Sequence, residues 1–304
     1  MFPKQFEKIP FYTTTRNFLY QKYRKFIMVH FPQKYANNLY RELFKKNINW
    51  NKPRDLNEII NYLAFKTDTS IWSKLADKYS VRDYVKEKGL ADILVPLLAK
   101  YDSPNDIDFK KLPNQFVLKC NNGSGDVVII KDKTKIIPSE IKKQITNSFQ
   151  SQFGLETAEP HYLKIKPCII AEEYLSSTEI SVVDYKVWCF NGNPYYIFTV
   201  SNRDSQKHTA DYNLFDLNWN KVDFHITEKY RNKLFIKKPN HLDEMLSYAK
   251  ILSQGFPEVR VDFYEVNDKV YFGEMTFTSQ CGRMDYFTPD FLKILGNQIL
   301  IHQG

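Results

Sequence analysis

Residues 260–277 read RVDFYEVNDKVYFGEMTF, and this stretch decides the fold. Two apolar runs rich in Val, Phe and Tyr flank Asn267-Asp268, a dipeptide typical of tight hairpin turns. A hairpin symmetric about that dipeptide places Asp262 opposite Glu274. Facing carboxylates repel each other unless a cation lies between them, and carboxylate oxygens together with substrate phosphates suit Mg²⁺. The stretch therefore predicts a two-stranded hairpin that carries a magnesium site. The alternative is that one of the two acids is a solvated strand residue.

Upstream of this hairpin, short apolar runs bounded by Gly, Asn and Asp begin near Val95 and predict further strands. They read QFVLKC (115–120), DVVIIK (126–131), PCIIAEEYL (167–175), VVDYKVWCF (182–190) and PYYIFTV (194–200). Helical spacing of apolar residues predicts helices over 241–254, over 289–300 and through much of 15–88. The pattern as a whole predicts an α+β fold, with a helical N-terminal part followed by mostly antiparallel sheets.

The loop between the first two predicted strands has the composition of a phosphate-binding flap. Lys119 ends one strand, and the turn Gly123, Ser124, Gly125 follows it. Glycines let the backbone approach phosphate oxygens, and a lysine on a strand supplies a fixed positive charge. It is not a P-loop, because no Gly-Lys-Ser/Thr follows and the next element is a strand. A plain hairpin with a glycine turn remains the alternative.

The order of these pieces along the chain resembles the ATP-grasp family. An Asp-Lys pair (77–78) comes first, then the strand lysine with its flap, an acid-rich hinge (170-IAEEYL), an Asp-x-Lys (184–186) and the Asp262 and Gly-Glu-Met-Thr hairpin. More narrowly, 75-LADKYSVRDYV, 116-FVLKCNNGSG, 184-DYKVWCFNG and 272-FGEMTF resemble the TupA-like group associated with teichuronopeptide and capsule biosynthesis.

The resemblance implies an ATP-grasp fold, in which two α+β subdomains clasp ATP. A basic, mostly helical region would cover residues 1–70, a subdomain with the phosphate flap residues 71–170, and a subdomain with the metal site residues 171–304. The implied cofactors are ATP and Mg²⁺.

The resemblance also implies roles for individual residues. The implied nucleotide-binding residues are Lys78, Lys119, Gly123, Ser124, Gly125, Glu172, Glu173, Leu175 and Asp184. Asp262 and Glu274 would hold magnesium together with Thr276, which stands where the wider family commonly has asparagine.

ATP-grasp ligases phosphorylate a carboxylate to an acylphosphate, which an amine then attacks, and an arginine is suited to hold the carboxylate. The catalytic candidates are Lys186, Arg203, Arg260 and Arg283. The loop around Gln280 and Arg283 is less rich in glycine than in relatives, a departure from the family pattern where the acceptor would be recognised.

Two other activities fit parts of the sequence. A glycosyltransferase could use the triplet Asp106-Ile107-Asp108 to hold a metal and a sugar nucleotide. A sugar kinase could use the same ATP and magnesium residues. The four cysteines, Cys120, Cys168, Cys189 and Cys281, lack the spacing of a zinc site and are expected to be small buried side chains.

The charge of the chain is concentrated at its start. Residues 1–60 hold 12 Lys and Arg against 4 Asp and Glu, an excess that equals the net charge of +8 for the whole chain. Aromatic residues are interleaved with these basic residues, namely Phe11, Tyr12, Phe18, Tyr20, Tyr23, Phe26 and Phe31. Such a region suits an anionic glycan or lipid-linked polysaccharide precursor, or the inner face of a membrane, although a solvated basic face is the simpler explanation. No nucleic-acid-binding motif is present.

The expected second substrate is an amine donor, either an amino acid or an amino sugar, an expectation that rests on the family resemblance. No apolar stretch is long enough to cross a bilayer, and the start of the chain lacks a secretory signal, so a cytoplasmic location is expected.

Overall fold

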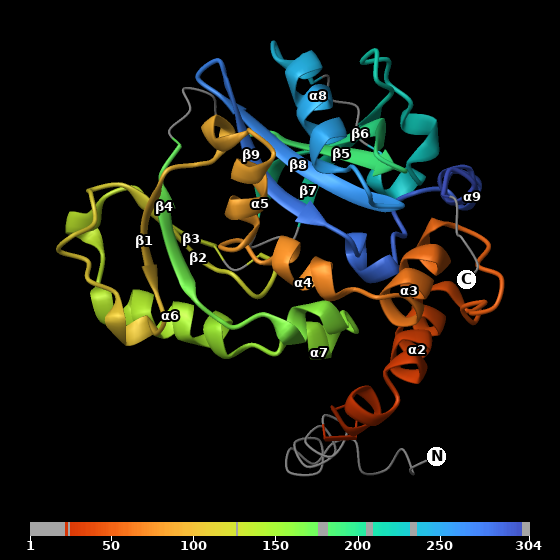
Figure 1. The fold of residues 1–304 in the computed structure, drawn as a ribbon, viewed down its shortest axis with the longest axis horizontal. Coiled ribbons are helices and arrows are strands. Elements are labelled where there is room, and N and C mark those ends of the chain that lie inside the picture. Colours follow the sequence, from red (N-terminus) through yellow and green to blue (C-terminus); the bar gives the residue numbers. More distant parts are fainter. Residues whose placement is uncertain are drawn as a thin grey trace.

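The computed structural model describes residues 22–23, 25–125, 127–175, 182–204, 209–231 and 236–299. Two antiparallel sheets dominate it (Figure 1). The four-stranded sheet has the order β1-β4-β2-β3, with β1 Leu97–Tyr101, β2 Phe116–Cys120, β3 Val127–Ile130 and β4 Ile169–Glu173. The five-stranded sheet has the order β7-β6-β5-β8-β9, with β5 Asp184–Phe190, β6 Asn193–Asp204, β7 Thr209–Phe215, β8 Glu258–Val266 and β9 Lys269–Thr276. The predicted α+β class is confirmed.

Helices cover both sheets and connect them. They are α2 Pro32–Phe44, α3 Leu56–Lys66, α4 Ser70–Ala76, α5 Val81–Glu87, α6 Pro138–Gln150, α7 Phe153–Thr157, α8 Leu242–Leu252 and α9 Pro289–Gly296. Short 3₁₀ turns include η3 Pro104–Asp106, η5 Pro160–Lys164 and η8 Ser279–Gly282. The helices predicted over 241–254 and 289–300 are confirmed. Of the predicted helical stretch 15–88, α2 to α5 are observed, while residues 15–21 lie outside the described part of the chain.

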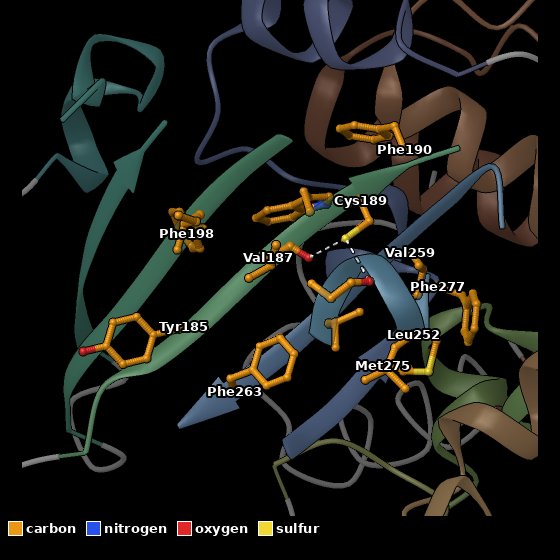
Figure 2. Packing of buried hydrophobic residues seen from close by; sticks show 14 of the residues in the cluster. Tyr185, Val187, Cys189, Phe190, Phe198, Leu252, Val259, Phe263, Met275 and Phe277 are labelled. Carbon is orange, nitrogen blue, oxygen red and sulfur yellow. Dashed lines mark hydrogen bonds between the residues drawn. The ribbon is translucent and has the colours of Figure 1, made fainter. Parts of the chain in front are cut away.

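The largest core lies around the five-stranded sheet. Figure 2 shows side chains of β5 and β8, such as Val187 and Phe263, together with Leu252 of α8. Cys189 belongs to this core: it is fully buried, its Sγ lies 3.8 Å from the carbonyl oxygen of Ala249, and burial raises the pKa of its thiol to about 12. All four cysteines are free, and three are buried as expected, whereas Cys281 is partly exposed. A second core, which includes Phe116 and Ile145, fills the space between the four-stranded sheet and α6.

The apolar side chains of helices α3, α4 and α5 pack into the core of the five-stranded sheet. Leu56, Trp72 and Val85 belong to the same buried cluster as Val187 and Phe263. Asp55 begins α3 by accepting a hydrogen bond from the backbone N–H of Glu58 at 3.0 Å. The segment that precedes the four-stranded sheet in the chain therefore supports the other sheet. The division of the chain at residues 70 and 170 stays a prediction.

The β8–β9 hairpin has the register that its sequence predicts, with one addition. Asn267 and Asp268 form the turn with φ angles of 52° and 61°, and Asp262 pairs with Glu274. The register shifts between Asp262 and Phe263, which leaves Gly273 as the extra residue of a bulge. A side chain at Gly273 would come within 3.0 Å of the Asp262 carbonyl oxygen. The glycine therefore lets the two strands stay paired on either side of the bulge.

Candidate functional site

Two adjacent rungs across strands β5, β8 and β9 carry the charged side chains of the candidate site. In the first rung Lys186 pairs with Asp262, and Asp262 pairs with Glu274. In the second rung Arg260 lies between Trp188 and Thr276. Directly paired residues point to the same face of a sheet, so the backbone register alone brings these side chains together.

Asp262 is the centre of this cluster. Its side chain is buried and accepts hydrogen bonds from Arg260 Nε at 2.6 Å and from Arg260 Nη2 at 2.8 Å. Lys186 Nζ forms a short ion pair with the same carboxylate and lies 3.6 Å from Asp184. Burial alone would raise the pKa of Asp262, but Arg260 and Lys186 outweigh it and lower that pKa to about 2. Asp262 is therefore ionised at neutral pH.

Glu274 and Thr276 stand at the more open edge of the cluster. The side chain of Glu274 is 33% exposed and lies 3.4 Å from Arg260 Nη2. The Thr276 hydroxyl accepts a hydrogen bond from Arg260 at 3.1 Å and donates one to Glu274 at 3.3 Å. Arg260 Nη1 donates to Ser279 Oγ at 3.2 Å. These bonds fix the guanidinium in one orientation, with carboxylate and hydroxyl oxygens around it.

A second ion-pair network lies on the four-stranded sheet. Lys119 Nζ is 2.6 Å from Glu172, on the neighbouring strand β4, and Arg82 of α5 is 3.1 Å from the other oxygen of the same carboxylate. Arg82 also donates to the carbonyl oxygen of Val95 at 2.8 Å. Glu172 and Arg82 are buried, whereas the side chain of Lys119 is 23% exposed. Lys119 is thus the member of this network that solvent and ligands can reach. Arg82 was not predicted from the sequence.

The predicted flap loop joins β2 to β3, which pair as an antiparallel hairpin. Lys78 Nζ forms a short hydrogen bond with the carbonyl oxygen of Gly123, so Lys78 and the turn of the flap are neighbours. Asn121 anchors the base of the loop, because its side-chain amide donates to Asp77 at 2.8 Å and accepts from the backbone N–H of Cys168 at 2.7 Å. Lys78 and Lys119 therefore both lie at the flap, and their contact with nucleotide phosphates stays a prediction.

The residues predicted to line the adenine differ in how far their groups are already bonded within the protein. The backbone N–H of Glu173 donates to the carbonyl oxygen of Pro96 at 3.0 Å, so this group is engaged within the protein. The Glu172 side chain is held by Lys119 and Arg82, as described above. Leu175, just after β4, is half-buried. The side chain of Glu173 is exposed, so a ligand could reach it.

Sequence reasoning also missed Glu159 and Tyr162. Glu159 is buried, accepts a short hydrogen bond from the Thr278 hydroxyl and lies 3.2 Å from Cys281 Sγ. Burial raises the pKa of Glu159. Burial also raises the pKa of Tyr162, and the nearby carboxylates of Glu159 and Glu274 raise it further. Tyr162 is therefore within electrostatic range of the Glu274 carboxylate. No spacing in the sequence indicates these interactions, because they join segments more than 100 residues apart.

The remaining candidates have different surroundings. Arg283 donates to the carbonyl oxygen of Thr157 at 3.2 Å, next to Glu159. Arg203 is part of β6, but its side chain is outside the described part of the structure. Asp106 is exposed at the end of η3, and Asp108 accepts a hydrogen bond from the backbone N–H of Lys110 at 3.0 Å. The two acids of the Asp-x-Asp triplet are therefore surface residues of a turn.

Another acid group lies at the far end of the β8–β9 hairpin. His241, Glu265 and Asp268 could together hold a metal ion, and a cavity of about 310 Å³ lies beside this turn. However, Glu265 accepts hydrogen bonds from His241 Nδ1 at 2.6 Å and from the backbone N–H of Asn240 at 3.1 Å. Its oxygens thus tie the start of α8 to the hairpin.

Among the described residues, no helix has the length and apolar character of a membrane-crossing segment. No curated protein matches the chain significantly.

Several solved structures resemble the chain at low identity. D-alanine-D-alanine ligase from Bacillus anthracis in complex with ATP is 14% identical with a TM-score of 0.41, and the match covers 74% of this chain and 60% of that one. The same enzyme from Helicobacter pylori is 18% identical, with a TM-score of 0.41 and coverage of 81% and 70%. L-amino acid ligase from Bacillus licheniformis is 12% identical, with a TM-score of 0.44 and coverage of 82% and 53%. The chain thus spans 60% of the first of these proteins.

A family model gives the decisive comparison. The model described as TupA-like ATPgrasp matches residues 58–300, which is most of the chain and includes both ion-pair networks and the flap. The chain belongs to the TupA-like ATP-grasp family.

Proposed function

We propose that the protein is an ATP- and magnesium-dependent ligase that joins a carboxylate to an amine. The observation that carries this proposal is the pairing of Asp262 with Glu274 across β8 and β9, beside Lys186 and Arg260. Membership of an ATP-grasp family supports it, and so do the ligases among the structures that resemble the chain.

The oxygen atoms around Glu274 fit a hard divalent cation. Asp262 is ionised, Glu274 is partly exposed, and Thr276 adds a hydroxyl oxygen next to Glu274. Asp262, Glu274 and Thr276 would hold magnesium, Thr276 more weakly than an asparagine would. When bound, the metal supplies positive charge to the phosphates of the nucleotide.

The protein's own cations account for the other requirements of phosphoryl transfer. Lys119 and Lys78 at the flap would bind and neutralise the phosphates, and the flap glycines let the backbone close over them and exclude water. The γ-phosphoryl group passes to a carboxylate oxygen and ADP leaves; the amine then attacks the carbonyl carbon and phosphate leaves. Asp262 and Ser279 already hold the guanidinium of Arg260, so Arg260 would offer the substrate carboxylate a positive charge that is fixed in place.

We further propose that the acceptor is an acidic glycan or a lipid-linked polysaccharide precursor, and that the amine comes from an amino acid or an amino sugar. The resemblance of the motifs to proteins linked to cell-surface polysaccharide synthesis supports this substrate class. The basic excess of residues 1–60 is the complementary charge.

Nucleotide binding is tested first, by thermal unfolding with ATP, ADP and UDP-sugars, each with and without Mg²⁺. A ligand at about 100 times its dissociation constant stabilises a protein by about 2.7 kcal/mol. We expect a magnesium-dependent shift with ATP and ADP. A shift with UDP-sugars alone would instead support glycosyl transfer.

Catalysis is tested by ADP release with pairs of carboxylates and amines. We expect Glu274→Gln to lower turnover by on the order of 10² to 10³. The control is Glu244→Gln, which changes an exposed carboxylate on α8 in the same way. ADP release that needs a sugar hydroxyl but no amine would indicate a kinase. Normal turnover and magnesium dependence in Glu274→Gln would refute the metal assignment.

A further inference from the structure

An apolar stripe is exposed on the helical segment that leads into α2. Residues 25–30 are helical, and the side chains of Tyr23, Phe26, Val29 and Phe31 are 56%, 54%, 54% and 52% exposed. The Phe26 ring lies 4.5 Å from the His30 ring and 6.4 Å from the Phe31 ring, measured between centroids. The rings of Phe26, His30 and Phe31 thus lie side by side on this surface. Scattered single apolar residues on a surface are common, but a contiguous group of this kind indicates an interaction site.

The opposite side of the same segment is fixed to the protein. Ile27 and Met28 are buried in a small core with Tyr35 of α2 and with Leu155 of α7. Rotating the segment to bury Phe26 would expose Ile27 and Met28, so the packing holds the aromatic stripe outward. Figure 1 shows that α2 and the segment before it extend away from the two sheets. The stripe is therefore presented at one end of the molecule.

The charge around the stripe is strongly positive. Residues 22–46 contain seven Lys and Arg and one acid, Glu42. Lys25, Lys34 and Lys45 are among the exposed side chains of this segment. We refer to the exposed residues Tyr23, Lys25, Phe26, Val29, Phe31 and Lys34 as the N-terminal surface. Of the other interleaved aromatic residues, Phe11, Tyr12, Phe18 and Tyr20 lie outside the described residues.

We propose that the N-terminal surface binds the interface of an anionic lipid bilayer. Aromatic rings next to lysines are the combination that enters the headgroup region, because the rings bury apolar area while the ammonium groups stay near lipid phosphates. A soluble polyanion would match the lysines but would leave the exposed rings of Phe26 and Phe31 in water. A bilayer satisfies both features at once. This contact would bring the catalytic sheets close to membrane-bound material without a spanning helix.

The test is co-sedimentation of the full chain with phosphatidylcholine vesicles that contain or lack phosphatidylglycerol. We expect binding to the anionic vesicles that weakens with added salt, and little binding to the neutral ones. Phe26→Ser combined with Phe31→Ser should weaken binding at least roughly tenfold, because both inserted rings are lost. Lys25→Glu combined with Lys34→Glu should also weaken it.

The matched control is Ile129→Ser combined with Phe224→Ser, which removes two similarly exposed apolar side chains elsewhere. It should bind vesicles as the unchanged protein does, and all variants should keep the thermal unfolding temperature. Equal loss in the control, or no loss in the Phe26/Phe31 variant, would overturn the proposal. So would equal binding to a soluble anionic polysaccharide that competes fully with the vesicles. Glu274→Gln should bind vesicles normally, so a failure of the ligase proposal is distinguishable from a failure of this one.

Discussion

Asp262 illustrates how one buried carboxylate depends on its partners. It is almost completely buried, and Arg260 and Lys186 together keep it ionised. Its native pKa of about 2 lies below the usual value of 3.8, so the folded state binds fewer protons than the unfolded chain in the window between them. This stabilisation is present above about pH 4 and is lost as the pH falls through 2.

Replacing the Asp262 carboxylate tests how much it contributes to the stability of the fold. Asp262→Asn removes the carboxylate that two buried cations share and leaves only the longer ion pairs of Lys186 with Asp184 and of Arg260 with Glu274. We expect it to lower the free energy of unfolding by about 3–5 kcal/mol at pH 7. Urea denaturation measures the change. Asp102→Asn, an exposed acid paired with Lys100, is the control and should change stability by less than about 1 kcal/mol. A similarly small effect of Asp262→Asn would contradict the importance of the buried cluster.

His161 is a buried titratable residue that, unlike Asp262, stays neutral in the folded protein. Both ring nitrogens are buried without a hydrogen-bond partner, and the ring packs edge-on against Trp72. Burial lowers the pKa of His161 from 6.5 to about 3, so the folded protein keeps the ring neutral while the unfolded chain protonates it. Stability therefore falls as the pH drops from about 6.5 toward 3.

We expect His161→Phe to reduce the acid sensitivity of the fold, because phenylalanine fills similar space and cannot be protonated. Between pH 7 and pH 5 the unchanged protein should lose about 2 kcal/mol more stability than the variant. Urea denaturation at the two pH values measures this. Parallel losses in both proteins would show that His161 does not titrate in this way.

At the scale of elements, the loop η8 follows β9 and connects the strands of the candidate site to helix α3. Gln280 and Cys281 have φ angles of 47° and 55°, in the left-handed region that non-glycine residues rarely adopt. Asn61 of α3 donates to the Gly282 carbonyl oxygen at 3.1 Å, and the Asn57 side chain bonds both polar groups of the Met284 backbone. Helix α3 therefore fixes the loop whose Ser279 orients Arg260.

Gly282→Ala tests this attachment. A Cβ there would come within 2.9 Å of the Asn57 carbonyl oxygen and closer still to Asn61, at a φ of 61°. Gly255→Ala, with a φ of 88° and nothing within 4 Å, experiences the backbone strain alone. We expect about 1 kcal/mol of destabilisation for Gly255→Ala and about 2–4 kcal/mol for Gly282→Ala, together with lower turnover. Equal effects in urea denaturation would show that the loop can shift away from α3.

The elements that the sequence predicts well are those with a strong local pattern. The β8–β9 hairpin has a turn dipeptide and alternating apolar residues, and the β2–β3 hairpin has its glycine turn. Strands β1 and β7 and helix α6 are not predicted by any local pattern. The five residues of β1 are mostly exposed, β7 carries polar residues such as Asp211 and Asn213, and α6 buries only Ile145. Because their local patterns are weak, the formation of these elements depends on tertiary contacts.

The residues of the candidate site likewise fall into those that a local pattern predicts and those that it does not. Asp262 and Glu274 follow from the pairing of one hairpin, so the sequence can place them. Arg82 bonds Glu172 and Thr278 bonds Glu159 across 90 and 119 residues of chain, so no local pattern predicts these two contacts. The bulge at Gly273 is local, but a symmetric hairpin without it would satisfy the same sequence pattern. Whether the hairpin forms the bulge at Gly273 therefore depends on the packing of the whole sheet.

At the scale of the whole molecule, each sheet carries one network in which a buried carboxylate holds two cations. Glu172 holds Lys119 and Arg82 on the four-stranded sheet, and Asp262 holds Lys186 and Arg260 on the five-stranded sheet. A nucleotide that contacts Lys119 with its phosphates and Glu274 through a metal would connect the two networks. Binding should then protect backbone amides from exchange in the flap and in β9 together.

Lys119→Ala is the variant that separates nucleotide binding from folding. Because Arg82 stays paired with Glu172, the buried carboxylate keeps a counter-charge, and we expect stability to fall by no more than about 1 kcal/mol. The dissociation constant for Mg-ATP, measured by calorimetry, should rise at least roughly tenfold because a charge-assisted contact to phosphate is lost. Lys100→Ala, an ion-paired lysine on strand β1 of the same sheet, should leave nucleotide affinity unchanged. A variant of Lys119 that unfolds more easily yet binds Mg-ATP normally would show that this lysine serves the sheet and not the nucleotide. Equal losses of affinity in both lysine variants would instead point to the general charge of the sheet.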